Sequence, residues 1–309
     1  MRPDVKPQIF LTRRVPDLVF SRLEASFALS DEIAGSAGLV TIPADVVGAA
    51  LFNAAGPSLR VVANFGVGYD SVDLAEATRR GIVVSNTPDV LTEATAELAI
   101  ALMLALLRRV VEGDRLVRRR DEWALAPTFM LGEGLAGKTL GIVGLGRIGR
   151  EVARLAEAFG MRVVHTRGSG PYEELPLDRL LAEVDVVSLH VPLTPETRHL
   201  IAAPELDLMR PSAVLVNVSR GPVLDEAALV DALVERRIAG AALDVYEREP
   251  EVSAGLLELE NVVLSPHLGS STHAARDAMG MLCVDALEAV LLRDELPANA
   301  VNPEALDAE

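Results

Sequence analysis

The chain has 309 residues, and its 29 lysines and arginines against 45 aspartates and glutamates give a formal net charge of −16. Half of the residues are hydrophobic, so the chain is long and apolar enough for two globular domains, each with its own core. The acidic balance argues against nucleic acid or an anionic membrane as a partner, because both bind basic surfaces.

The cysteine content and the apolar segments indicate the compartment. The single cysteine, Cys283, cannot form an internal disulfide, and no Cys/His cluster has zinc-site spacing, so no metal is expected. The opening residues 1–7 lack the apolar core of a secretory signal. The longest apolar stretch, residues 98–107, is shorter than the roughly 20 residues of a membrane helix. We therefore expect a soluble protein of the reducing cytoplasm.

Short apolar runs alternate with helical patterns from the first residues onward. In the first part of the chain, strands are predicted at residues 8–12, 38–41, 60–64 and 82–85, with helices at 45–52 and 73–80. Residues 92–111 then predict one long buried helix, which would connect two domains. The highly charged segment 112–121 follows it and predicts an exposed arm.

A second series of strands fills the rest of the chain, at residues 139–143, 162–166, 184–191, 213–218, 239–244 and 262–264. These runs are continuously apolar, as burial on both faces of a parallel sheet requires, and helices such as 225–237 separate them. They predict a doubly wound α/β sheet. A final helix at 273–293 would cross back to the first domain.

A glycine-rich segment, Gly144-Leu-Gly146-Arg147-Ile148-Gly149, links the strand at 139–143 to an amphipathic helix. Gly144 permits a tight turn, Gly146 lets the backbone approach a pyrophosphate, and Gly149 allows close packing of helix on strand. The helix N-terminus adds free N–H groups and a positive dipole end. A turn that merely packs is the alternative, but strand, helix and second strand are all in place. We expect the whole segment, Arg147 and Ile148 included, to bind a dinucleotide.

The second strand of this unit ends in His165-Thr166-Arg167-Gly168-Ser169, with no acidic residue to bind a ribose 2′-hydroxyl. A carboxylate would repel a 2′-phosphate, whereas a guanidinium binds one. The segment from Thr166 to Ser169 therefore favours NADP, with NAD still possible. If Arg167 is an ordinary exposed arginine, the cofactor choice stays open.

Three polar residues follow successive predicted strands, where open α/β sheets bind ligands: Arg220, Glu249 and His267. Taken singly, each is more often structural: a surface ion-pair former, a turn residue before a proline, a loop histidine. The other histidines, 165, 190, 199 and 273, are expected to be structural.

The pattern extends to Asn64-Phe-Gly-Val-Gly-Tyr-Asp70 and to residues 86–88, 90–95 and 191–196. With the glycine loop and the three polar segments, it covers essentially the whole chain. On these residues the chain resembles the D-isomer-specific 2-hydroxyacid dehydrogenases, most of all the glyoxylate and hydroxypyruvate reductases. Arg167 departs from NAD-type members, which carry an acid there, and favours the NADP-using reductases.

The resemblance implies two doubly wound parallel-sheet α/β domains: a flavodoxin-like substrate domain split between residues 1–98 and 279–309, and a Rossmann cofactor domain over residues 99–278. It implies Arg220, Glu249 and His267 as the catalytic set.

The resemblance also implies contacts to substrate and cofactor. Arg220 and His267 would contact the substrate, and the backbone around Val67 and Gly68 would hold its carboxylate. Thr95 and Asp244 match positions that face the nicotinamide end of the cofactor.

The chemistry of 2-oxo acid reduction needs these residue types. Hydride arriving at the 2-oxo carbon leaves negative charge on oxygen, so a proton donor such as His267 must stand within reach. A carboxylate such as Glu249 would orient the ring and favour the imidazolium. Arg220 can grip the substrate carboxylate and polarise the carbonyl.

We therefore expect NAD(P)H-dependent reduction of small 2-oxo acids, such as glyoxylate and hydroxypyruvate, to D-2-hydroxy acids. Within the same chemistry, a 2-ketogluconate-type reductase and a D-3-phosphoglycerate dehydrogenase are the alternatives. The latter is disfavoured because the ribose acid and an appended regulatory domain are missing. A dinucleotide-sensing, corepressor-like binding protein is a different class, which turnover would separate.

The arm over residues 112–136 mixes charge with an apolar cluster, Trp123, Phe129, Met130 and Leu131, that has no obvious partner within its domain. Exposed apolar patches mark interfaces, and twofold dimers are the commonest oligomers. We expect a homodimer.

Overall fold

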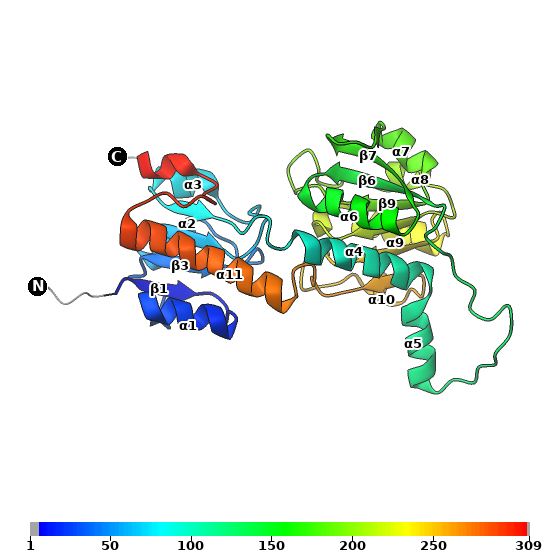
Figure 1. The fold of residues 1–309 in the computed structure, drawn as a ribbon, viewed down its shortest axis with the longest axis horizontal. Coiled ribbons are helices and arrows are strands. Elements are labelled where there is room, and N and C mark those ends of the chain that lie inside the picture. The colour runs from blue at the N-terminus through cyan, green and yellow to red at the C-terminus, as the bar shows by residue number, and fades with distance from the viewer. Residues whose placement is uncertain (1–5, 308–309) are drawn as a thin grey trace, which may run out of the picture. The chain divides into compact units, whose positions relative to one another are not determined.

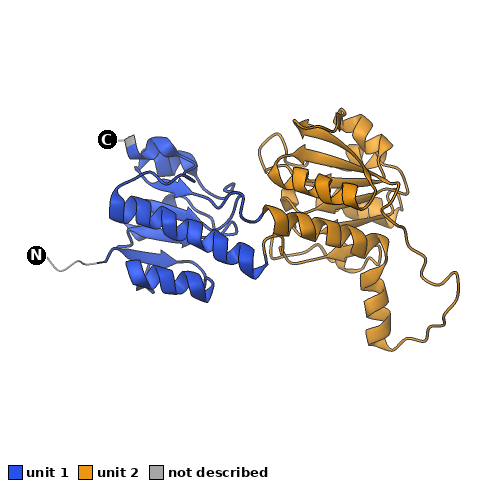
Figure 2. Ribbon diagram, viewed as in Figure 1, with its two compact units in different colours: residues 1–91, 271–309 blue, residues 92–270 orange. Residues whose placement is uncertain are grey.

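The computed structural model describes residues 6–307. The chain forms two compact units, one from residues 1–91 and 271–309 and the other from residues 92–270 (Figure 2). Both junctions fall a few residues before the positions predicted from sequence. Residues 1–5, which open the segment considered above as a secretory signal, lie outside the described residues, as do residues 308–309 at the other end of the predicted substrate domain.

The first unit is built on a five-stranded sheet in the order β2-β1-β3-β4-β5, and every neighbouring pair is parallel. Its strands are β1 Gln8–Leu11, β2 Ala28–Ser30, β3 Gly38–Thr41, β4 Val61–Asn64 and β5 Val83–Ser85. Its helices are α1 Asp17–Ser26, α2 Ala49–Ala55, α3 Leu74–Arg79 and α11 His273–Glu288. Four of these strands were predicted, and β2 was not.

Helices cover both faces of this sheet (Figure 1). On one face α11 packs on α1, where Gly280 lies directly against Val19, and on β3, where Gly38 lies against Leu287. On the other face, Phe52 of α2 and Ala77 of α3 are buried in a core with apolar residues of β3, β4 and β5. Covered on both faces, the parallel sheet has the predicted doubly wound, flavodoxin-like arrangement.

The predicted helix at 45–52 begins later, at Ala49. The carboxylate of Asp45 instead accepts hydrogen bonds from the N–H of Ile42, at 3.0 Å, and from the hydroxyl of Thr12. The aspartate side chain therefore shapes a turn there, before the helix starts.

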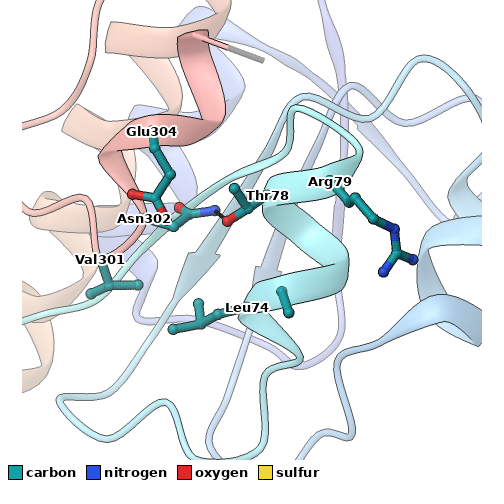
Figure 3. A pocket seen from close by; sticks show the side chains of 7 residues that line it. Leu74, Thr78, Arg79, Val301, Asn302 and Glu304 are labelled. Carbon is teal, nitrogen blue, oxygen red and sulfur yellow. Dashed lines mark hydrogen bonds between the residues drawn. The ribbon is translucent and has the colours of Figure 1, made fainter.

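The C-terminal segment is tied into the first unit by one buried side chain, Asn302. Its Oδ1 accepts a hydrogen bond from the N–H of Val84 at 2.7 Å, and its Nδ2 donates to the Ile82 carbonyl and the Thr78 hydroxyl. Figure 3 shows Asn302 beside α3, in a surface pocket that α3 and the last residues line together. None of the predicted site residues lines that pocket.

The second unit is built on a seven-stranded sheet in the order β12-β11-β10-β9-β6-β7-β8, parallel throughout. Its strands are β6 Thr139–Leu145, β7 Arg162–Gly168, β8 Glu173–Glu174, β9 Val186–Leu189, β10 Val214–Asn217, β11 Gly240–Leu243 and β12 Val262–Leu264. Helices α4 (Thr92–Leu107) and α6 (Arg147–Ala158) cover one face (Figure 1). Helices α7 Leu177–Glu183, α8 Ala203–Leu208 and α9 Glu226–Val234 cover the other.

Along the chain, strands β7 and β8 are added on one side of β6, and strands β9 to β12 are then added on its other side. The switch point of this order lies between β6 and β9. In such sheets, ligands bind at the carboxyl ends of the strands beside this switch point. The predicted Rossmann-type fold is confirmed, and both the glycine loop and the loops after β10, β11 and β12 lie at that edge.

The predicted single helix over 92–111 is wrong, because the chain forms two helices, α4 Thr92–Leu107 and α5 Val110–Arg119. Arg109 between them is left-handed, with φ 55°, and its guanidinium binds the carboxylate of Glu112. No residue of α5 is buried, and the charged segment predicted as an exposed arm is thus largely helical. Over residues 6–307, no helix is both long enough and apolar enough to cross a membrane.

Candidate active site

Arg220, Glu249 and His267 follow β10, β11 and β12, three adjacent strands of the second sheet. Because the strands are parallel, the three loops leave the sheet at the same edge. The structure therefore places these predicted residues at one edge of the second unit.

The imidazole of His267 is paired with the carboxylate of Glu249, at 2.7 Å between Nδ1 and Oε2. The other Glu249 oxygen accepts a hydrogen bond from the N–H of Tyr246 at 3.0 Å. Burial alone would raise the pKa of Glu249, but the hydrogen bond and charge of His267, the Tyr246 N–H and the charge of Arg220 outweigh it. The net pKa lies below the ordinary value of 4.5, so Glu249 is a carboxylate at neutral pH.

Asp244, at the end of β11, shapes the turn that carries His267. Its carbonyl accepts the N–H of His267 at 2.8 Å, and its carboxylate accepts the N–H groups of Leu268 and Gly269 and the hydroxyl of Ser265. Burial raises the pKa of Asp244 above 3.8, against the lowering effect of these hydrogen bonds. They hold His267 in a left-handed conformation, with φ 55°.

Thr95, at the start of α4, contacts the loop that carries His267. Its hydroxyl donates to the carbonyl of Gly269 at 3.1 Å. Thr95 and Asp244, both expected at the nicotinamide end, therefore contact the same residue after His267.

Asn217 positions Arg220, and the sequence reasoning missed it. Its Oδ1 accepts from the N–H and the hydroxyl of Ser219, at 3.0 and 2.9 Å, and its Nδ2 donates to the Arg220 carbonyl at 3.0 Å. A fully buried amide at the end of an apolar strand is the signal that could have revealed it.

The glycine loop has the shape that a dinucleotide needs. Gly144 has φ 101°, and a Cβ there would come within 2.8 Å of the His190 carbonyl. A Cβ on Gly149 would come within 2.3 Å of the Gly144 oxygen, whereas one on Gly146 would meet nothing within 4 Å. Gly146 caps α6, whose first turn holds Arg147 and Ile148. The open space above Gly146, at a helix N-terminus, fits a diphosphate.

The end of β7 carries the residues expected at the adenosine ribose. Thr166 is buried, and Arg167 is exposed, with φ 60°. Arg150 of α6, which sequence reasoning missed, donates to the Ser169 carbonyl at 2.7 Å and to the Leu145 carbonyl at 3.3 Å. It therefore ties the glycine loop to the segment that contains Gly168 and Ser169.

Glu196, in the loop after β9, lies near Arg167. A hydrogen bond with Thr194 is the main cause that lowers the pKa of Glu196, and the charge of Arg167 lowers it further. The carboxylate of Glu196 therefore interacts electrostatically with the arginine expected to bind a phosphate.

The predicted carboxylate-binding loop lies in the first unit, after β4. Asn64 donates from Nδ2 to the carbonyls of Gly66, at 3.2 Å, and Gly68, at 2.9 Å. Asn86 donates to the carbonyl of Val67 at 2.8 Å. Within residues 6–307, the N–H groups of Val67 and Gly68 have no hydrogen-bond acceptor. Two asparagines thus bind the loop's carbonyls, and the N–H groups stay available to an anion.

A family model described as "D-isomer specific 2-hydroxyacid dehydrogenase, NAD binding domain" matches residues 100–269. The chain belongs to the D-isomer specific 2-hydroxyacid dehydrogenase family. A glyoxylate reductase of Thermococcus litoralis is 44% identical to this family member, with 98% of each chain covered. One from Korarchaeum cryptofilum is 46% identical, again with 98% of each chain covered.

Among solved structures, this dehydrogenase is similar to an NADPH-dependent glyoxylate/hydroxypyruvate reductase of Sinorhizobium meliloti in complex with NADP and malonate. The TM-score is 0.85 at 37% identity, and the match covers 97% of this chain and 98% of the other. The family resemblance read from the sequence is therefore confirmed, and with it a nicotinamide dinucleotide as cofactor.

Proposed function

We propose that the protein reduces small 2-oxo acids, glyoxylate and hydroxypyruvate among them, to D-2-hydroxy acids, with NADPH as the preferred reductant. The observation that carries the proposal is the His267–Glu249 pair, at 2.7 Å, on the sheet edge that also bears Arg220. The glyoxylate reductases similar to this chain over nearly its whole length support the substrate class.

His267 is the proton donor in this proposal. Its Nδ1 binds Glu249, and its Nε2 has no hydrogen-bond partner among the described residues, so Nε2–H is free to protonate the substrate oxygen. The carboxylate of Glu249, bound to Nδ1, fixes the orientation of the ring. When bound, the reduced nicotinamide supplies the hydride to the 2-oxo carbon.

Two other groups orient the substrate. The Arg220 guanidinium binds the carboxylate and polarises the 2-oxo group as negative charge develops on its oxygen. In the first unit, the N–H groups of Val67 and Gly68 are available to a carboxylate, because the carbonyls of their loop already accept hydrogen bonds from Asn64 and Asn86. A substrate without a carboxylate is therefore held poorly.

The residues proposed to hold the dinucleotide surround the glycine loop and the end of β7. At the pyrophosphate and nicotinamide end they are Gly144, Gly146, Arg147, Ile148, Gly149, Thr95 and Asp244. At the adenosine ribose they are Thr166, Arg167, Gly168 and Ser169. NADPH is preferred because β7 ends without an acid and with Arg167, which can pair with a 2′-phosphate. NADH fits the glycine loop equally well and stays a possible cofactor.

The test is a rate panel with NADPH and NADH against glyoxylate, hydroxypyruvate, pyruvate and 2-ketogluconate. The proposal expects glyoxylate and hydroxypyruvate to have the highest kcat/KM, with NADPH ahead of NADH. Fastest turnover of 2-ketogluconate would move the assignment to that reductase class. Oxidation of neither cofactor with any acid would favour a dinucleotide-sensing binding protein.

We also propose that the enzyme is a homodimer in the cytoplasm, joined through the arm of residues 112–136. Trp123 and Phe129 stack on each other at 6.0 Å between ring centroids, yet both are exposed, as are Leu125 and Leu131. A second copy of the chain is the proposed occupant of this apolar face. Sedimentation at micromolar concentration should give twice the 32.9 kDa of one chain, and a single-chain mass would refute the dimer.

A further inference from the structure

His199, in the loop after β9, contacts both of the loops that carry Arg220 and Glu249. Its backbone N–H donates to the carbonyl of Pro222 at 2.8 Å, two residues beyond Arg220. Its imidazole Nε2 lies 2.8 Å from Oε1 of Glu247, two residues before Glu249. One residue therefore joins two loops that are far apart in sequence.

Glu247 is itself held by Glu226, the first residue of α9. The N–H of Glu226 donates to the Glu247 carboxylate at 3.2 Å, and the N–H of Glu247 donates to the Glu226 carboxylate at 3.1 Å. The Glu226 carboxylate also accepts the N–H of Ser253 at 2.9 Å. This reciprocal pair fixes the chain on both sides of Glu249.

The cluster around His199 is strongly acidic. Besides Glu247 and Glu226, Asp225 has a carboxylate oxygen 3.9 Å from Nδ1 of His199. Among residues 6–307, no lysine or arginine forms an ion pair with any of these three acids. In the described part of the chain, His199 is the basic side chain paired with Glu247 and Asp225, and its loss leaves the carboxylates of the cluster to repel one another.

We propose that His199 is a positioning residue, which acts through Glu247 to hold the loop of Arg220 against the loop of Glu249. The inference rests on the reductase function proposed above, because it assigns His199 a part in placing that catalytic set. Arg220 grips the substrate, so a shift of its loop lowers kcat and raises KM for the 2-oxo acid. A misplacement of about 1 Å costs about 100-fold in rate. The KM for NADPH is unaffected, because His199 contacts none of the residues proposed to hold the dinucleotide.

The experiment compares His199→Ala with His199→Gln and Glu247→Gln. His199→Ala should lower kcat/KM for glyoxylate about 10- to 100-fold, with an unchanged KM for NADPH. His199→Gln, whose amide can still donate to Glu247, should recover much of the loss. The double variant, His199→Ala with Glu247→Gln, should lose no more kcat/KM for glyoxylate than the more damaging single variant, because both changes remove the same contact.

Arg210→Ala is the matched control. Arg210 also sits in the second unit, where it pairs with Asp185 at 3.7 Å and donates to the Ala182 carbonyl, away from the catalytic loops. This variant loses an ion pair of similar kind and should keep its kcat/KM within about twofold.

The outcomes distinguish a failure of the His199 positioning role from a failure of the proposed reductase function. If the unsubstituted protein reduces no 2-oxo acid, the proposed function fails and the inference with it. If that protein is active but the folded fraction of His199→Ala keeps normal kcat and KM, only the inference is overturned. A loss in His199→Ala that merely matches that of Arg210→Ala also overturns it.

Discussion

Gly221 lies against the backbone of Tyr246 so closely that a Cβ on residue 221 would come within 1.9 Å of the Tyr246 carbonyl. Gly221 directly follows Arg220, and Tyr246 gives its N–H to Glu249. The two loops can meet because residue 221 has no side chain. The distance between Arg220 and the Glu249–His267 pair thus depends on the absence of a side chain at residue 221.

Replacement of Gly221 by alanine should damage both stability and catalysis. The added methyl group meets backbone, which cannot rotate away, so the loops must separate. Overpacking of this kind costs about 1–3 kcal/mol, and each kcal/mol lowers Tm by about 2–4 °C in a domain of this size. Gly134→Ala is the control, because a Cβ there meets nothing within 4 Å. Thermal unfolding and glyoxylate kinetics of both variants check the prediction, and equal behaviour would contradict it.

Replacement of His267 by alanine or asparagine removes the proposed proton donor. We expect kcat to fall on the order of 10²–10⁴-fold, with little change in NADPH affinity. His273→Ala, at the exposed start of α11, should leave kcat near normal. Near-normal turnover of the His267 variants would return this residue to a structural role.

Glu249 should stabilise the fold in a pH-dependent manner. Its folded pKa lies below the ordinary 4.5, so its carboxylate stabilises the protein above that pH, and this contribution is lost as the pH falls through the folded value. Glu249→Gln should therefore lower Tm at pH 7, and the gap to the unsubstituted protein should narrow below pH 4.5. Exposed Glu258, replaced by glutamine, is the control and should show no such trend. If the Tm difference between Glu249→Gln and the unsubstituted protein widens in acid, Glu249 does not stabilise the fold as a carboxylate.

Arg167→Asp tests the cofactor preference. A carboxylate there repels the 2′-phosphate, so KM for NADPH should rise about 10- to 100-fold and the preference should narrow or invert. The kcat at saturation should change little, because the phosphate contact is the same in ground and transition states. Arg162→Ala, on the same strand, is the control. If the unsubstituted protein uses NADH at least as well as NADPH, the reasoning from the missing acid is wrong.

Asn64→Ala tests the carboxylate-binding loop. Without its amide, the Gly66 and Gly68 carbonyls lose their donor and the loop relaxes, so KM for glyoxylate should rise about tenfold while KM for NADPH stays the same. Asn53 offers a matched asparagine in the same unit, where its carbonyl accepts from Arg80. Equal glyoxylate KM values for Asn64→Ala and Asn53→Ala would show that Asn64 does not shape this loop.

The sheets were predictable because their strands are short, apolar and parallel, so burial on both faces leaves a continuous signal in the sequence. The strands that were missed lack it: β2 is a short edge strand, and β8 is two exposed glutamates. The break before α5 was missed because no glycine or proline marks it. Arg109 is left-handed there, and its guanidinium pairs with Glu112 in the first turn of α5.

The glycine loop could be predicted from the sequence because each of its glycines is needed for a different steric reason. The asparagines that support the binding loops could not be predicted, because their hydrogen bonds depend on where the following loop folds back. Asn64 and Asn217 each end a parallel strand, β4 and β10, and each amide binds backbone atoms two to four residues further on. An asparagine at the carboxyl end of an apolar strand is therefore a usable signal for a preformed binding loop in this fold.

The first unit is closed by residues from the opposite end of the chain. Val84 pairs with Val301 and Asn302, and α11 covers a face of its sheet. During synthesis from the N-terminus, the central unit can therefore complete its core while the first sheet still lacks a helical layer and the partners of its edge strand. Until residues 271–307 have been synthesised, the uncovered face and the open edge strand of that sheet are free to pair with other chains.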